Sequence, residues 1–275
     1  MLIAFAAVAQ CALTYYVLNL PVKFSILAID GCSTLLLYNA SLILSKPKNP
    51  AGSPYLRTRW VFKNEGLLIV NTVLALLGLL YALLHVQMGT VWFLVGVAVL
   101  SLSYALPIFT IGGTKGGLRQ LPALKLFHIA LIWSLSTVGL PVLEAWNTGM
   151  EINWYQANYL GLTKILFLLI CTLPFDIRDM QQDSLYQLKT IPLMIGEHRA
   201  KIVCYGLLVL HTLLIALAPY SFPVIGGLLV TNVLIGLTMW LLLFRHIKHY
   251  HYVYLLDFAL IVQFVLVFVS ICFFR

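Results

Sequence analysis

The sequence predicts an all-helical integral membrane protein, a bundle of nine transmembrane helices. Of its 275 residues, 61% are apolar and 9% are charged, whereas about a quarter of an ordinary soluble domain is charged. The mean hydropathy is +0.97. The apolar residues are grouped in stretches of about 20, the length of helix that crosses a bilayer.

Nine such stretches follow one another along the chain, and each is long enough to cross the bilayer once. They cover residues 2–20, 22–45, 64–85, 88–110, 122–144, 156–176, 198–219, 221–244 and 254–274. The opening segment has neither a basic region nor a small-residue cleavage site, so we expect the first span to be retained. The connections are too short for a soluble domain. We therefore expect one membrane domain over residues 1–275, with an active site built from helix ends, loops and the space between helices.

The basic residues give the orientation of the spans. Fourteen of the 17 follow spans two, four, six and eight, and the others are Lys23, Lys164 and Arg275. Under the positive-inside rule this places the N-terminus in the cytoplasm and the C-terminus outside. The cytoplasmic loops are then about 46–63, 111–121, 177–197 and 245–253. The net charge of +8 is thus explained by topology rather than by nucleic-acid binding, and we expect a multi-pass protein of the bacterial plasma membrane.

An acidic run after the sixth span is the most informative polar feature. The chain has only nine acidic residues, and Asp176, Asp179 and Asp183 follow one another at i, i+3 and i+7. On a helix they lie within roughly 60° of one another, close enough to repel. Mg²⁺ would neutralise them, because it takes one or two carboxylates and bridges to phosphate oxygens. The alternative is a solvated acidic turn neutralised by Arg178 and Lys189.

A second polar feature is a glycine-rich turn at residues 111–117, after the fourth span. Lys115, Arg119 and Lys125 lie in or just after it, and three cations at a membrane edge could hold a diphosphate. Basic loops also arise from topology alone. The ligand-binding interpretation gains weight if the aspartates face this loop, because cations opposite a carboxylate–Mg²⁺ site would clamp a polyanion.

The run from Asp176 to Asp183, followed by Lys189-Thr190-Ile191-Pro192 and then Gly196, closely resembles the second aspartate-rich motif of the UbiA superfamily of intramembrane prenyltransferases. The segment from Ser103 to Lys125 is similar to that family's loop between helices four and five. The resemblance implies transfer of an isoprenyl group from a polyprenyl diphosphate to a lipophilic, aromatic acceptor within the membrane. It also implies that Mg²⁺ is held near the cytoplasmic face.

The resemblance assigns roles to individual residues. Asp176, Asp179 and Asp183 would be the catalytic metal ligands. The diphosphate would contact Lys115, Arg119, Lys125, Arg178, Lys189 and Asn39. Asn39 matches the leading asparagine of the first motif, but Ala40, Ile43 and Pro47 occupy its three aspartate positions. Glu65, at the start of the third span, is a possible substitute metal ligand.

Other functions remain open at this point. One is a non-catalytic isoprenoid-binding or scaffold protein, which loss of the first motif favours; another is an isoprenoid cyclase or lyase on the same fold. Asp30, Lys164 and Asp257 lie at or near membrane depth, as ionisable residues do in transporters. The sequence shows no inverted repeat of broken helices, so pairing or snorkelling is the simpler interpretation of these three.

Overall fold

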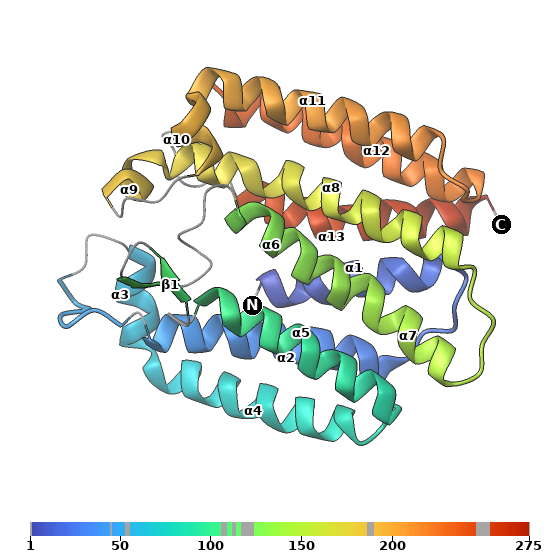
Figure 1. Ribbon diagram of the computed structural model, residues 1–275, viewed down its shortest axis with the longest axis horizontal. Helices are drawn as coiled ribbons and strands as arrows, with labels where there is room; N and C mark the ends of the chain where they lie inside the picture. The colour runs from blue at the N-terminus through green and yellow to red at the C-terminus, as the bar shows by residue number, and fades with distance from the viewer. Residues whose placement is uncertain are drawn as a thin grey trace.

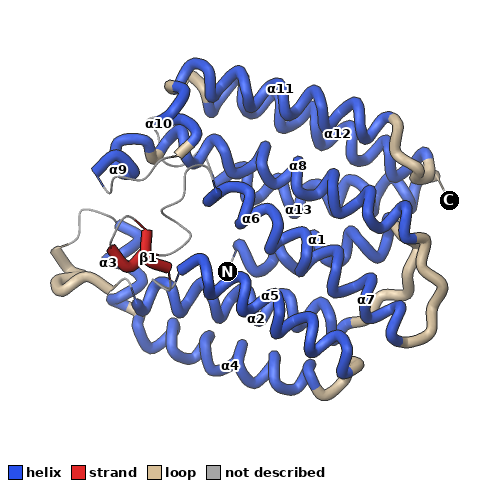
Figure 2. Tube along the Cα trace, in the orientation of Figure 1, coloured by secondary structure: helices blue, strands red, loops and turns tan. Residues whose placement is uncertain are grey.

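The computed structural model describes residues 2–44, 46–52, 56–105, 109–111, 114–116, 124–185, 190–245 and 254–274. Helices account for nearly all of the described chain, with one short two-stranded ribbon near one end (Figure 2). In a bilayer only helices and closed barrels satisfy their own backbone groups. A sequence made of long apolar stretches therefore folds as helices.

The elements follow the predicted spans closely. They are α1 (Leu2–Val17), α2 (Phe24–Leu44), α3 (Leu56–Lys63), α4 (Glu65–Leu83), α5 (Met88–Ala105), β1 (Phe109–Ile111), β2 (Thr114–Gly116), α6 (Leu124–Ser134), the π-helical η2 (Leu135–Gly139), α7 (Leu140–Asn147), α8 (Trp154–Arg178), α9 (Met180–Leu185), α10 (Ile191–Ile195), α11 (Glu197–Ala216), α12 (Phe222–Thr238), the π-helical η3 (Met239–Leu243) and α13 (Tyr254–Phe273).

Seven helical segments of the described chain are long and apolar enough to cross a membrane. They include two composite rods, one made of α6, η2 and α7 and one made of α12 and η3. The apolar helices over Leu2–Val17 and Met88–Ser103 are shorter. The protein is therefore an all-helical, multi-pass membrane protein, and the count of nine spans stays a prediction.

The long helices lie side by side as roughly parallel rods (Figure 1). One end of the bundle carries the end of α2, the starts of α4 and α6, and the junction of α8 with α9. The opposite end carries the connections from α1 to α2 and from α7 to α8. Of the loops predicted to be cytoplasmic, the described parts that contain α3, β1 and α9 lie at the first end (Figure 1). We call this first end the aspartate end.

The fourth predicted span is too long at its C-terminal side. It was expected to reach residue 110, but α5 ends at Ala105 and Phe109–Ile111 forms strand β1, which pairs with β2. Pro107 follows two residues after the helix. A proline disfavours helical backbone in the residue before it, so helices commonly end there.

Packing closes the rods into a bundle. Helix α1 packs between α2 and α13, α13 packs on α12, and α8 packs between α6 and α11. The α12–α13 contact is very close: a Cβ built on Gly227 would lie 2.7 Å from the Val267 Cα. Small residues permit such close approach of backbones in membrane bundles.

Buried polar side chains also connect the helices. Lys164 of α8 donates to the Gln10 amide oxygen of α1, and the Gln10 amide nitrogen donates to the Leu260 carbonyl of α13 at 2.6 Å and to Gln263 Oε1 at 3.1 Å. All are inside the bundle. This confirms pairing for Lys164. Asp30 is equally buried, but its Oδ2 has no hydrogen-bond partner in the described part of the chain.

Candidate functional site at the aspartate end

The end of α8 carries the first two aspartates. Helix α8 begins at an Asn153 cap, whose side chain accepts from the Gln156 N–H at 3.1 Å, and it continues through Pro174 to Arg178. Asp176 lies in its last turn. Asp179 ends the helix with φ −91° and ψ 7°. The chain then continues into the short helix α9, which carries Asp183.

Lys125 brings two of the aspartates together. It lies in the first turn of α6, which packs against α8. Its Nζ is 2.7 Å from Asp176 Oδ1 and 3.7 Å from Asp183 Oδ2. Both aspartates are buried, while Lys125 is partly exposed. Lys125, one of the three cations of the predicted cluster, therefore faces two of the three aspartates.

Asp179 has a different partner. Arg178 donates to both of its carboxylate oxygens, from Nε at 2.6 Å and from Nη2 at 2.7 Å. The Arg178 guanidinium also lies over the Phe175 ring, 5.1 Å from its centroid. An uninterrupted helix would place all three aspartates on one face, but α8 ends at Arg178. Among the described contacts, Asp176 and Asp183 share Lys125, and Asp179 pairs with Arg178.

The donor set fits one Mg²⁺ ion rather than a cage made entirely of protein ligands. Within the described ranges, no three His, Cys, Asp or Glu side chains lie close enough together to hold a metal ion. Asp183 Oδ2 is nevertheless buried without a hydrogen-bond partner among the described residues, and Asp176 lies across the same ammonium. Mg²⁺ is commonly held by one or two carboxylates with waters and substrate phosphates completing its shell. Two carboxylates meet that requirement.

Glu65 and Asn39, to which the resemblance assigned contacts with the metal and the diphosphate, also lie at the aspartate end. Their described contacts are with other protein residues. Glu65, at the start of α4, is exposed, and both of its carboxylate oxygens lie 2.8 Å from Lys46 Nζ. Asn39 is buried in α2, and its amide donates to the Thr72 hydroxyl of α4 at 3.0 Å. Their described contacts hold α2, α4 and the segment after α2 together.

The remaining predicted contacts fall partly outside the described structure. Lys115 lies in β2, paired in register with Thr110 of β1, but its side chain is not described. Arg119 and Lys189 lie outside the described residues. Their roles toward a diphosphate stay predictions.

Thr190 is a polar group whose position could not be anticipated. It precedes α10, its side chain is buried, and its Oγ1 has no hydrogen-bond partner among the described residues. The sequence marks it only as a member of the motif, because burial of a threonine at a loop end depends on how α10 packs on α8 and α11.

Comparison with known proteins identifies the fold. No protein-family model matches the sequence, and no curated protein matches it. Two solved structures do. One is a UbiA homolog from Archaeoglobus fulgidus bound to GPP and Mg²⁺, with a TM-score of 0.58 and 13% identity over 98% of this chain and 96% of that chain.

The second comes from work on digeranylgeranylglyceryl phosphate synthase in membranes. Its TM-score is 0.54, with 14% identity over 96% of this chain and 91% of that chain. Both matches extend over almost the whole length of each chain. The chain therefore has the fold of the UbiA superfamily, as the aspartate motif indicated.

Proposed function

We propose that this protein is a Mg²⁺-dependent UbiA-type prenyltransferase, which moves an isoprenyl group from a polyprenyl diphosphate to a lipophilic, aromatic acceptor. One observation carries the proposal: Lys125 of α6 meets Asp176 of α8 and approaches Asp183 of α9 at one end of a bundle with this fold. Buried carboxylates beside a partly exposed ammonium suit a ligand that has phosphate groups at one end and hydrocarbon at the other.

Each residue has a chemical role in this proposal. Asp176 and Asp183 would hold the metal, and Lys125 would donate to a diphosphate oxygen. Arg178 would orient Asp179 through its two hydrogen bonds. Bound Mg²⁺ would neutralise charge on the diphosphate as the allylic carbon–oxygen bond breaks. The bond's electron pair leaves with the diphosphate, and the acceptor attacks the allylic carbon and then loses a proton.

The position of the site supports ionisation chemistry. Asp176 is only 2% exposed, and charges act more strongly at buried sites than in water. The surrounding bundle is apolar, so a bound isoprenyl chain would lie among hydrocarbon side chains while its diphosphate lies at the polar end. A reacting allylic group would thus be kept away from bulk water.

Release of diphosphate from an allylic diphosphate tests the proposal. We expect purified protein to release diphosphate from geranyl diphosphate in the presence of Mg²⁺ and an aromatic acceptor, and Asp176→Asn to reduce the rate by at least about 100-fold, as loss of a charge-stabilising group does. Glu151→Gln is the matched control, because Glu151 is an exposed acid at the opposite end of the bundle. Equal rates in Asp176→Asn and the parent protein would contradict the proposal.

A second function, binding of an isoprenyl diphosphate without turnover, is favoured by one observation. The end of α2 carries Ala40 and Ile43 where the first motif has aspartates, and Ile43 is 45% exposed. Ionisation that needs carboxylates on both sides of the diphosphate would then fail. Binding without release, followed by a gain of release in the Ala40→Asp, Ile43→Asp double variant, would favour this alternative.

A further inference from the structure

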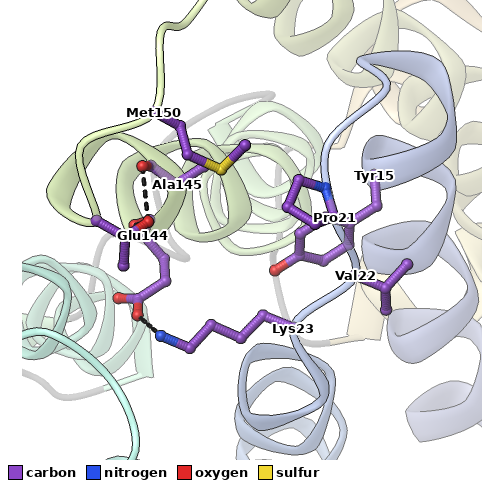
Figure 3. A pocket seen from close by; sticks show the side chains of 8 residues that line it. Tyr15, Pro21, Val22, Lys23, Glu144, Ala145 and Met150 are labelled. Carbon is purple, nitrogen blue, oxygen red and sulfur yellow. Dashed lines mark hydrogen bonds and ion pairs between the residues drawn. The ribbon is translucent and has the colours of Figure 1, made fainter.

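A second polar site lies at the opposite end of the bundle from the aspartates. It is a cavity of about 210 Å³ between the α1–α2 connection and the end of α7. Tyr15 and Lys23 line it on one side, and Glu144 and Met150 line it on the other (Figure 3). None of these residues belongs to the proposed prenyl-transfer site.

Glu144 is fixed by groups from two other segments. Its side chain is 1% exposed. It accepts from the Thr90 hydroxyl at 2.6 Å, from the Gln87 N–H at 3.1 Å and from Lys23. Gln87 and Thr90 lie at the start of α5, where the helix dipole favours a negative charge. The carboxylate is therefore fully partnered, and it holds the Lys23 ammonium in place.

Lys23 offers donors to the cavity. Its ammonium has three N–H groups, and its described partner is Glu144. The Lys23 side chain is 34% exposed against 1% for Glu144. Of the two charged groups in this ion pair, the Lys23 ammonium is therefore the more accessible. Lys23 is also one of only three basic residues assigned to this membrane face, where topology disfavours them.

Tyr15 provides a second free group. The residue is 2% exposed, and its hydroxyl has no hydrogen-bond partner among the described residues, although it lines the cavity. Leaving a buried hydroxyl unpaired costs free energy that a phenylalanine would avoid. The turn after α1, in which Asn19 has φ 53° and the Leu20 N–H donates to the Tyr15 carbonyl at 2.9 Å, positions the connection beside it.

The apolar lining is also well defined. Helix α7 ends in a Schellman motif: Gly149 has φ 84°, its N–H donates to the Trp146 carbonyl, and the Met150 N–H donates to the Ala145 carbonyl. The motif directs Met150 to the cavity. A neighbouring cavity of about 460 Å³ shares Tyr15 and Pro21 and is lined further by Tyr16, Asn19, Leu20 and Ile271. The two cavities therefore meet at Tyr15 and Pro21.

We propose that Tyr15 and Lys23 bind the phosphate of a membrane phospholipid, whose hydrocarbon lies along the neighbouring cavity beside Leu20 and Ile271. The Lys23 ammonium has N–H groups beyond the one that Glu144 accepts, and the Tyr15 hydroxyl can donate, so the two suit a phosphate rather than an amine. The site lies at the helix ends, at the depth of lipid headgroups. The adjoining cavity, which Leu20 and Ile271 help to line, offers room for hydrocarbon that free phosphate lacks.

The test compares three probes on the purified protein in detergent. We expect short-chain phosphatidylglycerol to raise the thermal unfolding temperature more than the matched diacylglycerol or inorganic phosphate, because ligands that bind the folded state stabilise it. Tyr15→Phe should weaken the apparent affinity by about three- to tenfold, which is the effect of one hydrogen bond. Without lipid, Tyr15→Phe should be at least as stable as the parent protein.

Two control variants locate the binding. Tyr155→Phe removes an exposed hydroxyl at the same end of the bundle and should leave the affinity unchanged. Asp176→Asn should also leave it unchanged, which separates this site from the proposed prenyl-transfer site. Unchanged affinity in Tyr15→Phe would overturn the proposal. So would an equal response to diacylglycerol, or saturation by inorganic phosphate at the same affinity.

Discussion

Lys125 is the residue on which the candidate site depends. In the described structure its ammonium is the group that faces both buried aspartates, at 2.7 Å from Asp176 and 3.7 Å from Asp183. Without it, two carboxylates would be left near each other in an environment that disfavours charge. Lys125 is therefore both a candidate diphosphate ligand and a counter-ion that stabilises the fold.

We expect Lys125→Met to lower the free energy of unfolding by about 2 kcal/mol, less than for a fully buried pair because Lys125 is partly exposed. Unfolding in a detergent mixture without divalent cations would measure this. Asp176→Asn in the same chain should restore part of the loss, since it removes one unpaired charge. Additive losses in the double variant would show that the two side chains do not interact.

Repulsion between the carboxylates of Asp176 and Asp183 also links ligand binding to the stability of the folded protein. Mg²⁺ together with a diphosphate should raise the thermal unfolding temperature, and each alone should raise it less, because the polyanion and the metal complete each other's contacts. Asp183→Asn should remove most of this increase. A full response in that variant would mean that the stabilisation arises elsewhere in the protein.

Among the elements, the helices α12 and α13 leave little room for an added side chain between them. A side chain at Gly227 would meet backbone atoms of Val267 at 2.7 and 2.9 Å, whereas one at the neighbouring Gly226 would meet only Ser270 Oγ at 3.9 Å. We expect Gly227→Ala to destabilise the protein by about 1–3 kcal/mol. Gly226→Ala should be nearly neutral. Comparable unfolding curves for the two variants would show that the helices separate at little cost.

At the scale of the whole molecule, the sidedness of the bundle can be tested directly. In a background in which all five cysteines are replaced by alanine, single cysteines at the exposed positions 48 and 197 should react with an impermeant maleimide only after the cells are opened. A cysteine at exposed position 151 should react in intact cells. Reaction at position 48 from outside would reverse the predicted orientation.

Hydrophobicity predicted the positions of the rods well because membrane helices are defined by local composition. The predicted stretch 221–244 corresponds to Phe222–Leu243, and 254–274 corresponds to Tyr254–Phe273. The short strands and helices within the connecting segments were not predicted. The strands β1 and β2 and the short helices α3, α9 and α10 depend on contacts, turns and proline positions rather than on apolar length.

The sequence indicated several residues of the candidate site, but it did not indicate how they are arranged. The acidic run identified Asp176 and Asp183, and the basic loop suggested a cation opposite them. Spacing alone could not show that α8 ends at Arg178 and that Asp179, the next residue, pairs with Arg178 instead. The ion pair of Lys23 with Glu144 was also beyond sequence reasoning, because 121 positions separate the two residues.

The polar contact between α1 and α13 constrains the order in which the protein can be completed during synthesis. Gln10 is fully buried, yet the Leu260 carbonyl and the Gln263 side chain that it contacts lie 250 and 253 positions later in the chain. At about 5–20 residues per second, the ribosome needs tens of seconds to make the intervening segment. Throughout that time the nascent chain holds an amide in the membrane without two of its native partners. The native contacts of Gln10 with α13 can therefore form only after α13 has been synthesised.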